Sequence, residues 1–270
     1  VSHLPGLPSV TGSSSSDLPS ISADGRFVVF QSLATNLVAG TDSNSATDIF
    51  LYDVLAGTVK LVSHLPGAPG TSANSASRAP VISADGKVVA FVSYASNLVN
   101  GSDSNGAYDV FVYDATSDTV KLVSHVPGTP TTAANGNSSF NPSTSTVFAS
   151  SISADGKFVA FQSQATNLVG GSDSNGTNFD VFLYDVTTTT VKLVSHLPGV
   201  PTTSASGASY NPTLSQDGKF VAFVSSDSNG LVPGTEANGG EDVFLYDAVA
   251  DTIRLVSHAA GSTLTGNNYS

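Results

Sequence analysis

The stretch Ser153-Ala-Asp-Gly-Lys-Phe-Val-Ala-Phe-Gln-Ser163 decides the fold, because it joins a turn signal to a strand signal and recurs along the chain. Its Asp-Gly pair predicts a type I′ hairpin turn, in which both central residues take a positive φ. The run after the pair is apolar on both faces, as expected of a strand that is covered on both sides. Copies of the stretch begin at Ser22, Ser83 and Ser215.

A second marker, Val-Ser-His, gives the length of the repeat. Its histidines stand at 3, 64, 125, 196 and 258, so that successive copies are 61, 61, 71 and 62 residues apart. This period predicts one domain over 1–270 that is built from four repeats, at approximately 4–64, 65–125, 126–196 and 197–258, with a C-terminal tail at 259–270. The third repeat is longer than the others, and its extra residues fall within 129–151.

Each repeat contains four strand signals. In the first repeat they are a weak one at 19–23, two that are apolar on both faces at 26–32 and 49–52, and a mixed one at 58–64. Four-stranded antiparallel units that bury their middle strands and expose their outer strand are blades of a β-propeller. The sequence therefore predicts an all-β fold, a β-propeller of four four-stranded antiparallel blades. A ring closed by these four blades is the first expectation, and part of a larger propeller or an open repeat array are the alternatives.

The repeat also resembles a known family. Residues 153–163 and their copies are similar to the Ser-Pro-Asp-Gly-Lys-x-Ile-Ala-Phe-x-Ser core of TolB-like (WD40-like) propeller repeats. The downstream Asp-Val-Phe-Leu-Tyr-Asp and Val-Lys-Leu-Val-Ser resemble the third and fourth strands of that family. The chain departs from the family in having Ala in place of Pro and a longer, more acidic loop before the third strand. The resemblance implies a propeller fold and no particular function, because this fold hosts scaffolds, binding proteins and enzymes.

The acidic loop before each third strand carries the pattern Asp-x-Asn-x-x-x-Asp, with Glu in place of the first Asp in the fourth copy. Calcium prefers six to eight oxygen ligands from carboxylates, amides and backbone carbonyls, and closely spaced oxygen side chains on a tight loop can supply them. The alternative is that these residues only shape turns, since Asp and Asn bond to their own backbone. Repetition of the pattern favours calcium as the cofactor. The predicted metal ligands are Asp42, Asn44, Asp48, Asp103, Asn105, Asp109, Asp173, Asn175, Asp180, Glu236, Asn238 and Asp242.

Other repeated side chains are predicted to be structural. The aspartates of the Asp-Gly pairs belong to hairpins, and Asp53 and its copies close the turn before the fourth strand. Lys60, Lys121, Lys192 and Arg254 discourage edge-to-edge pairing of outer strands. The five histidines are expected far apart on outer edges, which argues against a shared metal site.

Composition limits the partners. The chain has 21 acidic and 9 basic residues and a net charge of −12, which argues against binding to nucleic acid or to anionic membrane surfaces. It has no cysteine and no apolar run long enough to span a bilayer. The absence of an initial Met and of a signal sequence suggests a processed chain or a fragment. Its Ser, Thr, Asn and Gly content is typical of secreted, periplasmic or cell-surface proteins, so an extracellular or cell-surface location is expected.

These observations predict a non-enzymatic, extracellular, calcium-binding β-propeller that serves as a structural, adhesive or self-assembly module. An enzyme is not expected, because a catalytic site breaks symmetry whereas nearly every titratable residue here is repeated. The alternative function is binding of a glycan or a surface protein, with Tyr94, Tyr108 and Tyr210 as candidates for stacking on sugars, and a hydrolase comes third. Self-association is expected through exposed blade edges or through the N-terminal strand at 1–6.

Overall fold

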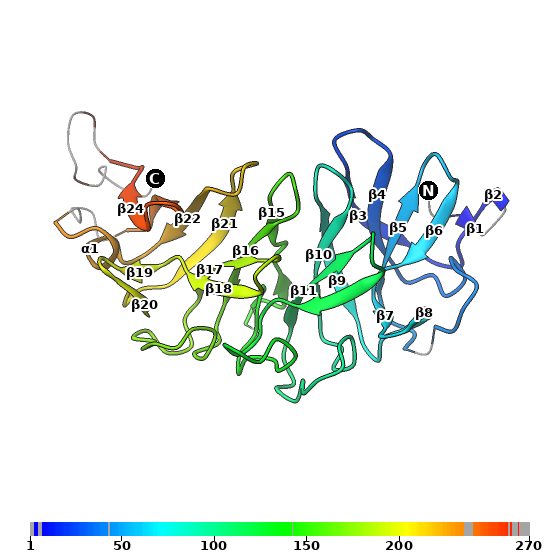
Figure 1. Cartoon of the computed structure of the whole chain (residues 1–270), viewed down its shortest axis with the longest axis horizontal. Helices are drawn as coiled ribbons and strands as arrows, with labels where there is room; N and C mark the ends of the chain where they lie inside the picture. Colours follow the sequence, from blue (N-terminus) through cyan, green and yellow to red (C-terminus); the bar gives the residue numbers. More distant parts are fainter. Residues whose placement is uncertain are drawn as a thin grey trace.

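A computed structural model describes residues 3–4, 7–42, 44–141, 143–234, 240–258, 260 and 264. Each repeat forms one four-stranded antiparallel sheet in which neighbours in sequence are neighbours in space (Figure 1). Blade 1 contains β3 (Ser16–Ile21), β4 (Phe27–Ser32), β5 (Asp48–Asp53) and β6 (Thr58–Leu61), and blade 2 contains β9 (Ser77–Ile82), β10 (Val88–Ser93), β11 (Asp109–Asp114) and β12 (Thr119–Leu122). Blade 3 contains β15 (Ser151–Ile152), β16 (Phe158–Ser163), β17 (Asp180–Asp185) and β18 (Thr190–Leu193), and blade 4 contains β21 (Ser209–Leu214), β22 (Phe220–Ser225), β23 (Asp242–Asp247) and β24 (Thr252–Leu255).

The structure confirms the prediction that the middle strands of a blade are buried and that its outer strand is partly exposed. In blade 2 the middle strands β10 and β11 are buried almost throughout, and Phe91 lies opposite Phe111 in their register. The outer strand β12 alternates between exposed and covered residues, and its Lys121 is exposed. A buried centre with a charged, solvated edge is the arrangement of a propeller blade. The predicted fold class is therefore correct.

Short hairpins precede blades 1, 2 and 4. They are β1 (His3–Leu4) with β2 (Leu7–Thr11), β7 (His64–Leu65) with β8 (Ala68–Ser72), and β19 (His196–Leu197) with β20 (Val200–Ser204). The fourth strand of blade 1 therefore ends at Leu61 and not at His64, and the histidine begins the connecting hairpin. The long third repeat places β13 (Phe140–Asn141) and β14 (Thr146–Val147) in its insertion. N-terminal residues 3–4, expected as a spare strand, pair with β2 of their own chain.

Among the described residues one helical turn, α1 (Ser228–Leu231), interrupts the all-β pattern, and no helix there has the length and apolar character needed to cross a bilayer. The prediction of a type I′ turn is wrong. Of the pair Asp24-Gly25 in blade 1, only Gly25 takes a positive φ, of 71°, and its N–H donates to Ser22 O at 2.9 Å. The Asp24 carboxylate accepts hydrogen bonds from Ser22 Oγ and Arg26 N, and these bonds hold a longer loop closed.

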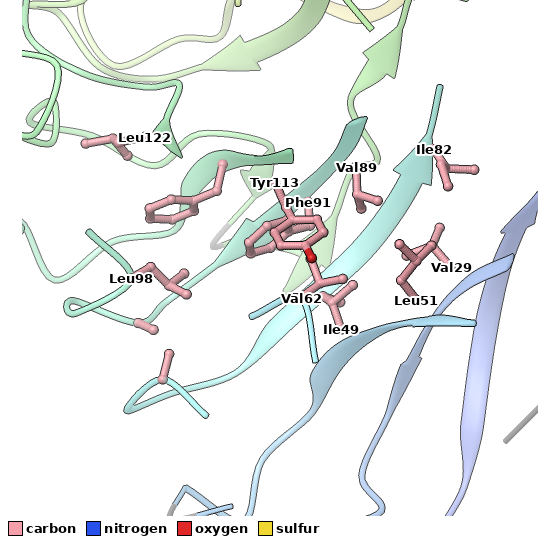
Figure 2. Close-up of a cluster of buried hydrophobic side chains, with 13 residues drawn as sticks. Val29, Ile49, Leu51, Val62, Ile82, Val89, Phe91, Leu98, Tyr113 and Leu122 are labelled. Atoms are coloured by element: carbon pink, nitrogen blue, oxygen red, sulfur yellow. The ribbon is translucent and has the colours of Figure 1, made fainter. Parts of the chain in front are cut away.

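The hydrophobic cores lie between blades. Figure 2 shows the core in which Val29, Ile49, Leu51 and Val62 of blade 1 face Phe91 and Tyr113 of blade 2. We call the side of a blade that packs on the following blade its forward face, and the side that packs on the preceding blade its rear face. In blade 2 the forward face consists of Ala90, Val92, Val110, Val112 and Val123, and the rear face consists of Val89, Phe91, Phe111, Tyr113 and Leu122.

The four blades form an arc along the longest axis of the molecule, with blades 1 and 4 at opposite ends (Figure 1). Backbone hydrogen bonds join each blade to the next, from Ala23 N to Ala84 O at 2.9 Å, from Asp85 N to Ala154 O at 3.2 Å and from Ala154 N to Gln216 O at 2.8 Å. In the described part of the chain the ring does not close between blade 4 and blade 1. A closed four-blade ring is therefore not the arrangement seen, and the alternatives of a larger or open array fit the arc.

Candidate functional site

The acidic loop of blade 1 brings its three predicted ligands together. Asp48, at the start of β5, is buried, and its Oδ1 accepts a hydrogen bond from Ser63 Oγ at 2.7 Å. The Asn44 side chain reaches towards it, with its amide nitrogen 3.5 Å from Asp48 Oδ2 and 2.8 Å from Ala73 O. Asp42 accepts from the backbone N–H groups of Asn44 and Ser45, both at 3.2 Å. The loop is thus a closed set of Asx turns around a buried carboxylate.

Blades 2 and 3 repeat this arrangement. Asn105 Nδ2 lies 2.9 Å from Asp109 Oδ2, and Asn175 Nδ2 lies 3.3 Å from Asp180 Oδ1. Asp103 is the counterpart of Asp42, and burial raises its pKa. Asp173 likewise accepts from backbone N–H groups in its own loop. In blade 4, Asp242 is buried, whereas Glu236 and Asn238 lie outside the described residues.

Burial makes the second aspartate of the loop pattern a weak acid. It raises the pKa of Asp48, Asp109 and Asp180 to about 7 in each case. The serine and asparagine hydrogen bonds lower these pKa values, but they do not outweigh the cost of keeping a charge away from water. Burial therefore favours the protonated form of these carboxyls.

The asparagine amide faces the carboxylate with its donor nitrogen, so hydrogen bonds fill the role that a cation would take. The described residues contain no group of three or more His, Cys, Asp or Glu side chains placed to hold a metal. Each described loop offers two carboxylates, and the amide oxygen of Asn175 is buried without a hydrogen-bond partner. Calcium binding therefore remains a prediction for these loops.

A second repeated arrangement joins the blades at their connecting hairpins. The rings of His64, His125 and His196 are buried and lie edge-on, 5.9 Å from Tyr113, Tyr184 and Tyr246 of the following blade. Each histidine Nδ1 contacts the backbone carbonyl of the next residue at 2.9 Å and must therefore carry a proton. These histidines are not on exposed outer edges as predicted, because the hairpin turns them into the gap between blades.

An aspartate completes this contact at two of the three interfaces. Tyr113 OH donates to Asp118 at 2.5 Å and Tyr246 OH donates to Asp251 at 2.7 Å, while His196 Nε2 lies 3.3 Å from Asp251. At the middle interface Thr189 takes the place of the aspartate. Tyr184 OH and His125 Nε2 are buried there without hydrogen-bond partners.

We expect the substitution Thr189→Asp to stabilise the protein by about 1–2 kcal/mol, because it supplies an acceptor to a buried hydroxyl that lacks one. Thr189 has a φ of 56°, and Asp118 and Asp251 have a φ of 55°, a conformation that Asp tolerates better than a β-branched residue. Urea denaturation at pH 7 measures the gain. Thr189→Gly is the control, since it relieves the backbone without supplying an acceptor, and an equal gain in both variants would refute the hydrogen-bond explanation.

A hollow of ligand size lies between blades 3 and 4. It has a volume of about 360 Å³, which falls in the range of small-molecule sites. Phe158, Leu183 and Val249 supply apolar walls. Four charged side chains surround them, Lys192 and Lys219 with Asp185 and Asp217. Lys219 Nζ lies 3.3 Å from Asp217 Oδ2, so this rim carries charges of both signs.

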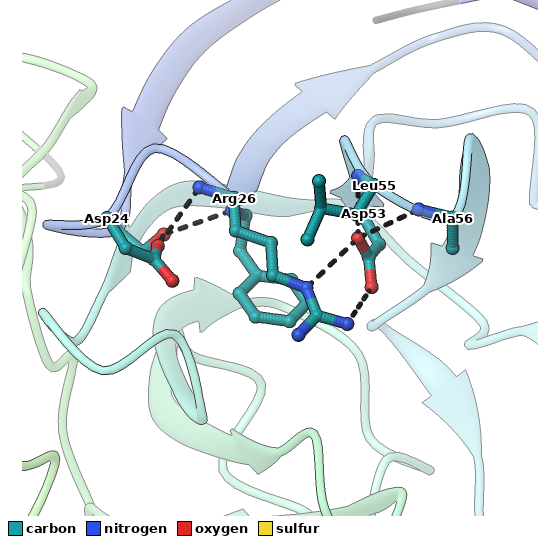
Figure 3. A network of polar contacts seen from close by, with 7 residues as sticks. Asp24, Arg26, Asp53, Leu55 and Ala56 are labelled. Atoms are coloured by element: carbon teal, nitrogen blue, oxygen red, sulfur yellow. Dashed lines mark hydrogen bonds and ion pairs between the residues drawn. The ribbon is translucent and has the colours of Figure 1, made fainter.

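Blade 1 carries a related network at its own turns, shown in Figure 3. The Arg26 guanidinium binds Asp53 with contacts of 2.8 and 3.2 Å, and it lies 4.7 Å from the centre of the Phe27 ring. Asp53 also accepts from Leu55 N and Ala56 N, as predicted for a turn-closing residue. The bond with Arg26 lowers the pKa of Asp53, which stays ionised.

The three tyrosines proposed for stacking on sugars do not form one site. Tyr94 and Tyr108 lie together with ring centres 5.2 Å apart, and Tyr108 packs on Phe140 at 4.3 Å. Tyr210 belongs to β21 in blade 4. Sequence reasoning missed the pocket between blades 3 and 4, since its lysines and aspartates come from two repeats and each matches its copies elsewhere.

Comparison with known proteins places the fold. Neither protein-family models nor curated sequences gave a match. Among solved structures, TolB from Acinetobacter baumannii is 19% identical with a TM-score of 0.46, over 90% of this chain and 43% of that one. Dipeptidyl peptidase 4 from Porphyromonas gingivalis is 15% identical with a TM-score of 0.51, over 89% of this chain and 32% of that one. A prolyl endopeptidase is 15% identical with a TM-score of 0.50, over 92% and 30%.

The fold is therefore a β-propeller, with a TolB structure among those similar to it, and the chain spans less than half the length of these three structures. The predicted function needs correction. The two similar structures with TM-scores of 0.50 or more are those of a dipeptidyl peptidase and a prolyl endopeptidase. They contradict the prediction of a non-enzymatic, extracellular, calcium-binding structural or adhesive module.

Proposed function

We propose that this chain is a non-catalytic propeller domain that holds a peptide segment for a peptide-cleaving unit, outside the cytoplasm. The pocket between blades 3 and 4 is the observation that carries the proposal. Its apolar walls suit aliphatic and aromatic side chains, and its two lysines and two aspartates suit charged side chains or the termini of a peptide. The likeness to two peptidase structures at TM-scores of 0.51 and 0.50 supports the choice of a peptide ligand.

The chemistry of the described residues supports a binding role without catalysis. The lining of the pocket includes neither histidine nor serine, so it lacks the usual base and nucleophile of peptidases. The buried histidines at 64, 125 and 196 have Nδ1 bonded to a backbone carbonyl and lie between blades. Reacting groups would then come from another domain or another chain, while the propeller positions the substrate.

Binding of a fluorescein-labelled Gly-Lys-Phe-Asp-Gly peptide, followed by fluorescence anisotropy, tests the proposal. The double variant Lys192→Glu/Lys219→Glu should weaken binding by about tenfold, which corresponds to about 1.4 kcal/mol. Arg254→Glu is the matched control, because Arg254 faces Leu245 in the same register as Lys192 faces Leu183 but lies outside the pocket.

Mass spectrometry of the same peptide after incubation reports on catalysis, and the proposal expects the peptide to stay intact. Cleavage by the purified chain that is lost on substitution of a pocket residue would show that the domain is itself an enzyme. Equal affinity of the peptide for the double variant and for the Arg254→Glu control would show that the pocket does not bind the peptide.

A further inference from the structure

The two ends of the arc expose the two halves of one blade-to-blade interface. Val62, Val123 and Val194 follow the fourth strands of blades 1 to 3 and are fully buried by the next blade. The corresponding Val256 of blade 4 is 51% exposed. Ala222, Val224, Val243 and Leu245 complete this forward face, and each is only partly covered.

The rear face of blade 1 is open in the complementary way. Its Ile21 is 61% exposed, whereas Ile82 and Leu214, at the same position in blades 2 and 4, are 6% and 8% exposed. Tyr52 is partly exposed, whereas its three copies are fully buried. Phe30, Phe50 and Leu61 form a small core of their own that no preceding blade extends within the described residues.

The glycines of the turns show how closely the two faces fit. A Cβ on Gly86 would lie 2.3 Å from the Phe27 ring of the preceding blade, and a Cβ on Gly218 would lie 2.3 Å from the Phe158 ring. Gly25, their counterpart in blade 1, has nothing within 4 Å of such an atom. Phe220 of blade 4 stands at the position of Phe27 and Phe158, with no following turn above it in the described chain.

The connecting hairpins point the same way. β8 packs against β6 and β20 packs against β18, so each hairpin lies on the fourth strand of the blade before it. The hairpin of β1 and β2 precedes blade 1, and among the described residues no fourth strand of another blade lies beneath it. An incoming blade 1 would bring its own hairpin to the outer strand β24.

From these observations we propose that the forward face of blade 4 binds the rear face of blade 1 of a second copy of this chain, and that two copies close a ring of eight blades. A second copy is the occupant whose surface the structure already shows, because the three internal interfaces bury apolar side chains at corresponding positions of each blade. The contact is head-to-tail, and such contacts form rings when the rotation closes. Eight blades is at the upper end of the usual range for propellers.

Sedimentation equilibrium of the whole chain tests this directly. The expected species has twice the 27.3 kDa mass of the chain, in a concentration-dependent equilibrium with the single chain. Val256→Asp should leave only the single chain, because it puts a charge in the interface at a side chain that is exposed in the free molecule. Gly25→Asn should do the same, since Asn tolerates a positive φ but its side chain would collide with Phe220 of the second copy. Val249→Asp, at a side chain 77% exposed on a turn, is the control and should associate normally.

Mixing the two variants identifies the geometry. Val256→Asp retains a good rear face and Gly25→Asn retains a good forward face, so an equimolar mixture should recover a species of twice the chain mass. A face-to-face dimer of blade 4 would instead be insensitive to Gly25→Asn, and that result would overturn the proposal. The proposal would also be overturned if sedimentation equilibrium showed only the single chain at concentrations up to about 100 μM, which is about 100 times a Kd of 1 μM.

Discussion

The free energy of unfolding of the metal-free protein should fall as the pH rises from about 4 to 7. Asp48, Asp109 and Asp180 have a pKa of about 7 in the folded state, raised by burial from 3.8. Between these values the unfolded chain has released the protons that the folded chain still holds. The unfolded state therefore binds fewer protons, and stability falls with pH until the folded-state pKa is passed. Each site contributes a loss of up to about 4 kcal/mol.

Guanidinium denaturation at several pH values, in buffer with a chelator, measures this slope. The triple variant Asp48→Asn/Asp109→Asn/Asp180→Asn should be nearly flat over the same range, because it has no proton to lose there. Asp24→Asn is the control and should keep the slope, since hydrogen bonds lower the pKa of exposed Asp24 out of this window. A slope of the opposite sign in the parent chain would mean that the loop carboxyls are ionised when folded.

Guanidinium denaturation at several pH values also tests whether the predicted calcium sites bind calcium. A bound calcium ion would hold the loop carboxylates in their charged form and so lower their folded-state pKa. If the loops bind calcium, saturating calcium should raise the stability at pH 7 and abolish the fall between pH 4 and 7. An unchanged profile would show that hydrogen bonds alone satisfy these loops.

Gly86→Ala should destabilise the protein by about 2–5 kcal/mol, whereas Gly25→Ala should cost only about 1–2 kcal/mol. Both glycines take a positive φ, 72° at Gly86 and 71° at Gly25, so the backbone strain of an alanine is the same. Only Gly86 also meets a neighbour, the Phe27 ring of the preceding blade, and such overpacking adds about 1–3 kcal/mol. Urea denaturation of both variants at dilute concentration gives the difference. Equal losses would show that the blades have room to separate at this point.

The sequence was sufficient to predict the blades because their signals are local and repeated. Each signal lies within a single repeat, and four copies of it support the same prediction. In the first repeat these signals are the apolar runs at 27–32 and 49–52 and the acidic residues at 42–48. Asn44 and Asp48 do come together as the pattern suggested. The direction of the asparagine amide could not be predicted, because the side chain presents either oxygen or nitrogen and neighbouring carbonyls such as Ala73 O decide which.

The repeat pattern did not predict features that depend on contacts between two repeats. The strand predicted over 58–64 extends three residues beyond the observed end of β6 at Leu61. Val62 continues the alternating pattern in the sequence, although the chain has already turned towards the next blade at this point. The contact of His64 with Tyr113 joins residues of different repeats. The open arrangement of the blades also depends on two repeats at once. The angle between neighbouring blades follows from how the glycines and small side chains of one face pack against the aromatic residues of the next.

The turn glycines of blades 2 to 4 pack directly against the preceding blade, and a double-mutant cycle of Gly86→Ala with Phe27→Ala tests this packing most directly. Truncation of the Phe27 ring removes the group that the new methyl would strike, 2.3 Å away. We predict that Gly86→Ala costs at least about 1 kcal/mol less in the Phe27→Ala background than in the parent chain. Additive losses within about 0.3 kcal/mol would contradict the packing of blade on blade described above.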